Sequence, residues 1–315
     1  MERSVGIYQP FFKASLIERL DPGFIALDWM SNPTPALREL ALHKHIAVQN
    51  IYSRHQLTGL LSPKFFAKTN LHSQQVYDWI ADNPGHDIYL INGGPYGPYT
   101  TYNSVERTKI SQGPAFESWM RALCMTFGLE LPEELPRQTN ANRCSCNYWI
   151  ASPTFWENWN NEVIEPIFAM MDRCKETDKI FAYAKYRGPT PVYNITFFYE
   201  RLIDYYVART KFRAIYYPWS EQSVLSLDYH PTVRVYLEEM IPLVDRIDAA
   251  GQWRDSDKAW LQQRFAGLSS GGVIVDTLAF DPADFDLPRS YPMPIGLGDN
   301  RNSHVPPRIL DEQKG

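Results

Sequence analysis

Short apolar runs alternate with segments of helical periodicity along roughly the first 210 residues, and this alternation constrains the fold most. Val5–Tyr8, Phe24–Leu27 and Leu57–Leu61 have the length of strands, and the run His86–Asn92 is apolar and aromatic almost throughout. A run of that kind is typical of a strand covered on both faces. Strands that alternate with helices predict an α/β fold, with a mixed sheet flanked by helices.

The remaining segments give a domain outline. Helical spacing of apolar residues predicts helices over 36–50, 73–81, 115–127 and 195–209, and residues 147–151 form another strand candidate. Ser152 followed by Pro153 predicts the start of a further helix. We expect an α/β domain over 1–225, a helical extension over 226–280 with a strand at 271–275, and an extended Pro-rich tail over 281–315.

Composition narrows the function classes. The formal charge is −5, which argues against a nucleic-acid-binding protein, because such proteins normally carry a basic excess. Aromatic residues make up 14% of the chain, including 19 Tyr and 9 Trp, whose rings carry a polar group. We expect many of these rings to line a cleft, such as a sugar-binding groove; the alternative is a core with a polar rim.

The sequence carries few signals of cellular location. The first residues lack a long apolar run, and the longest uncharged apolar stretches are far shorter than the ~20 residues that cross a membrane. We therefore expect neither a leader nor a transmembrane segment. Cys144 and Cys146 form a C-x-C without a second pair, so we expect reduced thiols and a cytoplasmic location, with the inner face of the membrane as the alternative. The oligomeric state is left open.

Asn92, Gly93 and Gly94 directly follow the most apolar strand. Ligands of open α/β sheets bind beyond the carboxyl ends of the strands, and glycine lets backbone N–H groups approach a phosphate. The spacing matches neither the P-loop of ATPases nor the dinucleotide fingerprint of dehydrogenases. A ligand loop and a simple Gly-Pro turn both fit the pattern.

Charged side chains mark further candidate positions. Glu200 can serve as a general base or merely complement a helix dipole, and the neighbouring Arg201 has the donor geometry for a diphosphate. Lys64 follows a buried strand, where it can meet a phosphate or simply face solvent. Asp28 ends the second strand and has the same two interpretations.

The order of these motifs resembles that of bacterial surface-polysaccharide glycosyltransferases with a GT-A-like fold. The resemblance covers roughly residues 5–210 and rests on Arg38-Glu39-Leu40, Leu57–Leu60, Asn147–Ala151 before Phe155-Trp156, and Phe198–Leu202. It implies an enzyme of the hexosyltransferase type that moves a sugar from a UDP- or GDP-sugar to a glycan acceptor.

The resemblance also implies roles for single residues. Glu200 matches the late acidic position that faces the acceptor, so it is the expected base, and Arg201 and Lys64 would hold the diphosphate. Asn147 would bind a sugar hydroxyl, and Tyr8 would stack on the base or ribose.

Asn92 stands near the place where such enzymes carry an acidic metal-binding pair, and Asp87 opens the same strand. The loop lacks the D-x-D that would hold Mn²⁺ or Mg²⁺, so metal dependence stays open. Without a metal, the diphosphate would be held by Lys64, Arg201 and backbone amides. The missing D-x-D also leaves a non-catalytic carbohydrate-binding or polysaccharide-assembly protein as the alternative function. A hydrolase is a weaker third interpretation, because no spacing singles out two carboxylates.

Overall fold

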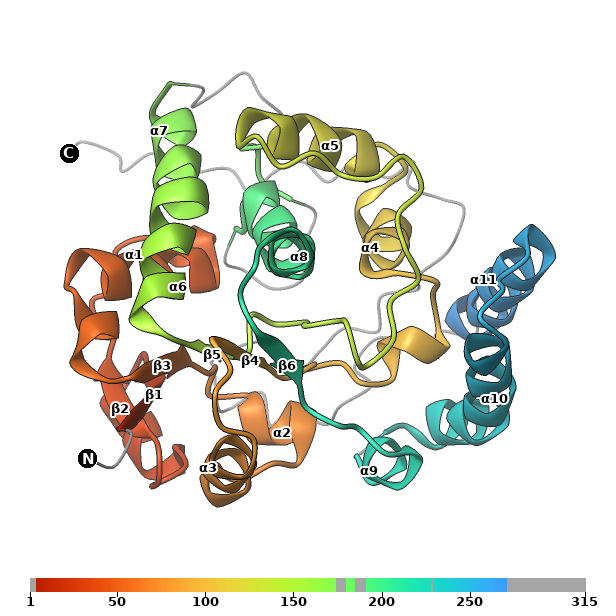
Figure 1. Ribbon diagram of the computed structural model, residues 1–315, viewed down its shortest axis with the longest axis horizontal. Coiled ribbons are helices and arrows are strands. Elements are labelled where there is room, and N and C mark those ends of the chain that lie inside the picture. Colours follow the sequence, from red (N-terminus) through yellow and green to blue (C-terminus); the bar gives the residue numbers. More distant parts are fainter. Residues whose placement is uncertain (1–3, 174–179, 185–190, 228, 271–315) are drawn as a thin grey trace, which may run out of the picture.

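The computed structural model describes residues 4–173, 180–184, 191–227 and 229–270, and a six-stranded mixed sheet forms its centre. The sheet order is β2-β1-β3-β5-β4-β6 (Figure 1). The strands are β1 (Val5–Phe11), β2 (Ile25–Asp28), β3 (Leu57–Leu60), β4 (Ile88–Leu90), β5 (Trp149–Ala151) and β6 (Ala214–Tyr216). β5 is antiparallel to both of its neighbours, and the other neighbouring strands pair in parallel. The prediction of an α/β fold with a mixed sheet is confirmed.

Helices cover both faces of the sheet (Figure 1). One face carries α1 (Arg38–Val48), α4 (Ser104–Gln112), α5 (Phe116–Thr126), α6 (Pro153–Trp159), α7 (Glu165–Arg173) and α8 (Asn194–Arg209), with a π-helical turn, η5 (Asn160–Ile164), between α6 and α7. The other face carries α2 (Phe65–Thr69) and α3 (Ser73–Asp82). Short 3₁₀ turns are η1 (Ala14–Arg19), η2 (Pro35–Leu37), η3 (Ile51–Arg54) and η4 (Gly97–Tyr99).

The C-terminal described helices lie beside one end of the sheet (Figure 1). They are α9 (Glu221–Leu225), α10 (Pro231–Ala250) and α11 (Asp255–Ser270), and they share an apolar cluster with Tyr99 of η4. The predicted strand at 271–275 and the predicted tail over 281–315 lie outside the described residues. Among the described helices, none combines the length and apolar character needed to cross a bilayer.

The aromatic residues mainly build the interior. Apart from Ile7, the largest fully buried side chains are all aromatic, and Trp149, Trp156 and Trp159 have no exposed surface. Trp149 and Trp156 pack with a centroid separation of 4.4 Å, and the buried His43 lies edge-on to both. Most of the bulk that we expected in a cleft therefore packs between the sheet and its helices.

The carboxyl ends of the parallel strands lie at one edge of the sheet, which we call the carboxyl edge. Leu60 and Leu90 are both paired with Trp149, the first residue of the antiparallel β5. Ser62, Asn92 and Asn147 therefore lie just beyond the same edge, although they come from distant parts of the chain. This edge carries most of the candidate site residues.

Candidate functional site

Three segments meet in direct contact at the carboxyl edge. The Gly93 N–H donates to the Ser145 carbonyl at 3.3 Å, which joins the loop after β4 to the loop before β5. The Cys146 N–H donates to Glu200 Oε1 at 2.7 Å, which joins the second loop to α8. A fourth segment, α2, adjoins these three, because its Lys68 donates to Cys146 Sγ at 2.9 Å. The sequence-predicted residues Asn92, Gly93, Gly94, Asn147, Glu200 and Arg201 therefore lie in one neighbourhood.

The loop before β5 has an unusual backbone. Cys146 and Asn147 are consecutive residues with left-handed φ values of 69° and 54°. Non-glycine residues rarely adopt this conformation, and such strain concentrates at functional sites. Asn147 is 3% exposed, and its Oδ1 has no hydrogen-bond partner among the described residues. The loop thus holds a buried acceptor that a ligand hydroxyl can satisfy.

The glycine amides of the Asn92-Gly93-Gly94 loop are engaged within the protein. Of its two interpretations, a turn and a ligand loop, the contacts favour the turn: Gly93 N–H donates to the Ser145 carbonyl and Gly94 N–H donates to Asn92 Oδ1 at 3.0 Å, so neither amide is left for a phosphate. The Asn92 side-chain amide also donates to Asn140 at 2.7 Å. A Cβ at Gly93 would lie 2.7 Å from the Tyr148 ring, so glycine is required there for packing. The loop shapes the edge through these internal contacts.

Glu200 connects the loop before β5 to the cations of the site. Its Oε2 accepts from Arg201 at 2.6 Å, while its Oε1 accepts from Cys146. Burial raises the pKa of Glu200, but Arg201, Lys68 and the Cys146 N–H lower it more, so the net shift is downward. The carboxylate is therefore ionised at neutral pH, and each oxygen keeps a second lone pair for another donor.

Arg143 is the most unusual group at this edge. Its side chain lies in the loop before β5, is 4% exposed, and has no hydrogen-bond partner for Nε or Nη1 among the described residues. A Cβ at Gly97 would lie 2.9 Å from its Cζ, so glycine there gives the guanidinium its space. Burial and repulsion from Arg201 and Arg107 lower the pKa of Arg143 to about 10, which leaves it charged at neutral pH.

Two further arginines face Arg143 from α4 and α8. Arg201 Nε donates to Thr108 Oγ1 at 2.7 Å, which fixes α8 against α4. Arg107 lies over the Phe265 ring at 4.4 Å and has a hydrogen bond with Tyr96. Sequence reasoning missed Arg107, Arg143 and Lys68, because each stands in a segment without a recognisable motif.

Asp204 lies one helical turn after Glu200 and is buried. Its carboxylate accepts from Cys144 N–H at 2.8 Å and from the Gln138 amide at 3.0 Å. Burial raises the pKa of Asp204 to about 8, against the lowering effects of Cys144 N–H and Arg143. The carboxyl group is therefore mostly protonated at neutral pH, which leaves the neighbouring arginines with little compensating charge.

This pKa predicts a stability that falls as pH rises. Between the unfolded pKa of 3.8 and the folded pKa of about 8, the folded state binds one proton more than the unfolded state. Burial lowers the pKa of His43 to about 3. Below pH 6.5 the unfolded state therefore binds a proton at His43 that the folded state does not, and His43 reduces the stability of the protein mainly in that range. From pH 6.5 to 8.5 we expect the free energy of unfolding to fall by about 2 kcal/mol, measured by urea titration.

Two variants test the origin of this slope. Asp204→Asn removes the titrating group, so its free energy of unfolding should change little over the same pH range. Asp78→Asn, at an exposed position of α3, should keep the slope of the original protein. A free energy that is constant or rises from pH 6.5 to 8.5 in the original protein would contradict the assignment.

Two predicted site residues lie elsewhere, which corrects the sequence-based interpretation. Asp87 precedes β4, about 16 Å along the strand direction from Asn92, and accepts from Arg213 N–H at 2.8 Å. The Tyr8 hydroxyl lies 3.1 Å from Nε2 of His55, which precedes β3, so the ring leans toward the opposite edge. Asp87 is far from the carboxyl edge because it precedes β4, whereas the backbone of Tyr8 is level with Leu60 and only its hydroxyl turns back to His55.

Asp28 and Lys64 also lie at the carboxyl edge. Asp28 ends β2, which stands four strand positions from β4, or about 19 Å at the usual spacing. Its Oδ1 accepts from Met30 N–H at 2.9 Å. Lys64 precedes α2, and one helical turn later Lys68 reaches Cys146. Lys68 takes the position that we expected for Lys64.

The residues at this edge do not fit Mn²⁺ or Mg²⁺. Within the described ranges, no three His, Cys, Asp or Glu side chains form a metal-binding group. Glu200 is engaged by Cys146 and Arg201, and the neighbouring charges are cationic. A divalent cation requires carboxylate or carbonyl oxygens, so this donor set disfavours it.

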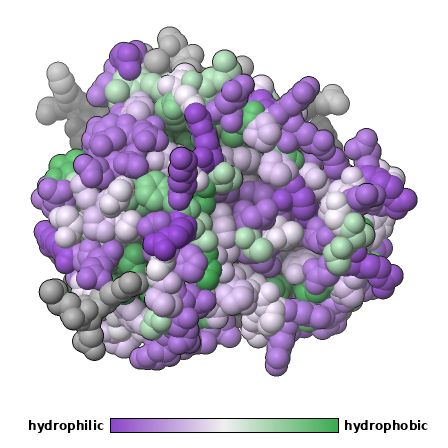
Figure 2. Space-filling model, in the orientation of Figure 1, coloured by the Kyte–Doolittle hydropathy of each residue, from purple (hydrophilic) through white to green (hydrophobic). Residues whose placement is uncertain are grey.

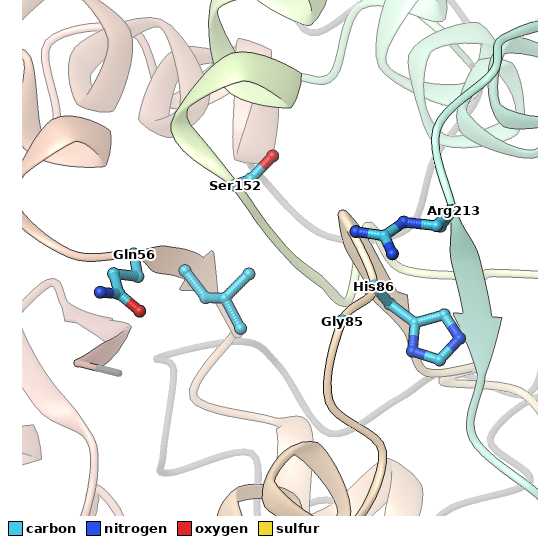
Figure 3. A pocket seen from close by; sticks show the side chains of 6 residues that line it. Gln56, Gly85, His86, Ser152 and Arg213 are labelled. Carbon is cyan, nitrogen blue, oxygen red and sulfur yellow. The ribbon is translucent and has the colours of Figure 1, made fainter. Parts of the chain in front are cut away.

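Two surface depressions lie away from this site. One of about 270 Å³ is lined by residues at the opposite edge, with Gln56 on one side and His86 and Arg213 on the other (Figure 3). Ser152, which also lines it, caps α6 by accepting from Phe155 N–H. Another depression lies along α9 alone, and on the face in Figure 2 hydrophobic residues form small patches among hydrophilic ones. The carboxyl edge is singled out here by its side-chain chemistry.

Comparisons with known proteins give no relative for this chain. No protein-family model, no curated protein sequence and no solved structure matches it.

Proposed function

We propose that this chain is a glycosyltransferase that moves a sugar from a UDP- or GDP-sugar to a glycan acceptor. One observation carries the proposal: the loop after β4, the loop before β5 and the Glu200-Arg201 pair are in contact with one another at the carboxyl edge. Ligand sites of α/β sheets lie at this edge. The GT-A-like character inferred from the sequence is part of the same proposal.

The charges at the edge suit a departing nucleoside diphosphate. As the sugar–phosphate bond breaks, negative charge develops on the leaving oxygen, and positioned cations stabilise it. Arg143 and Arg201 are close enough to repel each other, and Glu200 interacts with both Arg201 and Lys68. Burial opposes the charge of Lys68, but Cys146, Tyr148 and Glu200 raise its pKa well above the usual value. Arg143 and Lys68 therefore stay charged at neutral pH, and Arg201 forms an ion pair with Glu200.

Glu200 is the proposed base for an inverting transfer. The acceptor oxygen forms its bond to the sugar while the bond to the diphosphate breaks, and the acceptor proton moves to Glu200. Asn147 Oδ1 is the proposed acceptor for a sugar hydroxyl, because it is buried without a partner among the described residues. We further propose a cytoplasmic location, which the free thiols of Cys124, Cys144 and Cys146 support.

Unfolding in the presence of nucleotides tests the proposal. UDP or GDP at about one hundred times its dissociation constant should raise the free energy of unfolding by about 2.7 kcal/mol, whereas uridine and guanosine should act far more weakly. UDP- and GDP-sugars with mixed oligosaccharide acceptors should then release nucleoside diphosphate, as detected by mass spectrometry. Stabilisation by oligosaccharides alone, with no response to either nucleotide, would instead support the non-catalytic carbohydrate-binding alternative.

A further inference from the structure

A buried guanidinium in which two nitrogens lack an acceptor among the described residues needs an explanation. Nearly all buried polar groups in proteins have partners, and a buried charge without one is costly. Arg143 is 4% exposed, and its Nε and Nη1 have no partner among the described residues. Gly97 leaves the space that the guanidinium occupies, since a Cβ there would lie 2.9 Å from Cζ. The chain therefore holds donors in place whose acceptor must come from outside the described residues.

The charges around Arg143 identify the acceptor as an anion. Arg107 and Arg201 both repel Arg143, and the ion-pair partner of Arg201 is Glu200. Asp204 is the other nearby carboxyl group, and its burial keeps it mostly protonated at neutral pH. Three guanidinium groups thus face one ionised carboxylate, which leaves an excess of about two positive charges. Guanidinium groups bind phosphate oxygens in a bidentate manner, which suits a diphosphate.

We propose that Arg143, with Arg107 and Arg201, binds the diphosphate of the nucleotide donor directly and takes the place of a divalent cation. The inference rests on the proposed function and adds the residues that bind the diphosphate. Two of them, Arg107 and Arg143, lie in segments without a recognisable sequence motif. The cations neutralise the diphosphate and hold its oxygens in a fixed geometry, which is the work a bridging metal would otherwise do. Arg201 contributes by exchanging part of its pairing with Glu200 for the ligand.

Titration calorimetry with inorganic pyrophosphate in EDTA tests this site on the full chain. The original protein should bind pyrophosphate without a divalent cation, and Arg143→Met should weaken the binding at least tenfold. Arg143→Lys should give an intermediate affinity, because it keeps the charge and loses the bidentate geometry. Arg54→Met, at an exposed position of η3 before β3, is the matched control and should leave the affinity unchanged.

Folding of the variants is measured by circular dichroism and thermal melting. Arg143→Met should melt at the same or a higher temperature without ligand, because it removes a buried charge whose Nε and Nη1 have no partner among the described residues. The inference is overturned if the original protein binds no pyrophosphate, if EDTA abolishes binding, or if Arg143→Met binds as tightly as the original. Arg143-dependent pyrophosphate binding without any response to UDP or GDP would uphold this anion site and reject the glycosyltransferase. If the protein turns over a nucleotide sugar but Arg143→Met leaves pyrophosphate binding unchanged, the glycosyltransferase proposal is upheld and the proposed anion site at Arg143 is rejected.

Discussion

Replacing Glu200 with Gln is expected to lower the rate of sugar transfer at least ~100-fold, because an amide cannot accept the acceptor proton. Nucleoside diphosphate affinity should stay the same or increase. The Gln side chain keeps an oxygen for the Cys146 N–H, and loss of the carboxylate frees Arg201 for the ligand. Transfer kinetics and calorimetry with UDP and GDP measure the two effects separately.

The two roles open to Glu200 differ in these measurements. If Glu200 only holds the loop before β5 in place, Glu200→Gln should lose nucleotide affinity together with turnover. Turnover within tenfold of the original rate would remove Glu200 from the catalytic role. Glu157→Gln, at an exposed position of α6, is the matched control and should leave both quantities unchanged.

The largest expected effect on stability belongs to Trp156. Its side chain has no exposed surface, its indole N–H donates to the Thr58 carbonyl at 2.8 Å, and its ring packs on Trp149. Trp156→Ala leaves a cavity and removes the donor of a buried carbonyl, so we expect a loss of about 4 kcal/mol. Urea unfolding followed by circular dichroism measures the loss.

Met125→Ala is the control for this experiment. Met125 is 74% exposed on α5, and surface substitutions of this kind change the free energy of unfolding by about 0.5 kcal/mol or less. A loss below about 1 kcal/mol for Trp156→Ala, combined with weaker glycan binding, would contradict the structural role given to this ring. It would instead support the aromatic cleft that the composition first indicated.

Much of the fold follows from local patterns in the sequence. The apolar runs predicted β1 to β5, and Ser152-Pro153 marked the start of α6, where the Ser152 hydroxyl accepts from Phe155 N–H. The prediction missed β6, because its three residues are too short to show a period and pair only with β4. It also missed α4, whose mainly polar sequence shows weak periodicity; in the structure Asn103 caps this helix by accepting from Glu106 N–H.

The site was less accessible to sequence reasoning. The rule that ligands bind beyond the carboxyl ends of strands pointed to Asn92. Asn147 was proposed from the family resemblance, and it lies at the same edge because β5 is antiparallel to its neighbours. The sheet order separates Asp28 from both residues. Missing α2 and α4 also meant missing Lys68 and Arg107, which those helices carry. Arg143 lies in an irregular loop, and its role depends on Gly97 and Arg201, which only tertiary structure brings near it.

The most direct test of the account is a crystal structure of the protein grown with UDP and another grown with GDP. The account predicts that one nucleotide binds at the carboxyl edge, with diphosphate oxygens within hydrogen-bond distance of Arg143 and Arg201 and a site for the sugar beside Asn147. A diphosphate bound at the opposite edge near Asp87, or a nucleotide that leaves Arg143 untouched, would contradict it.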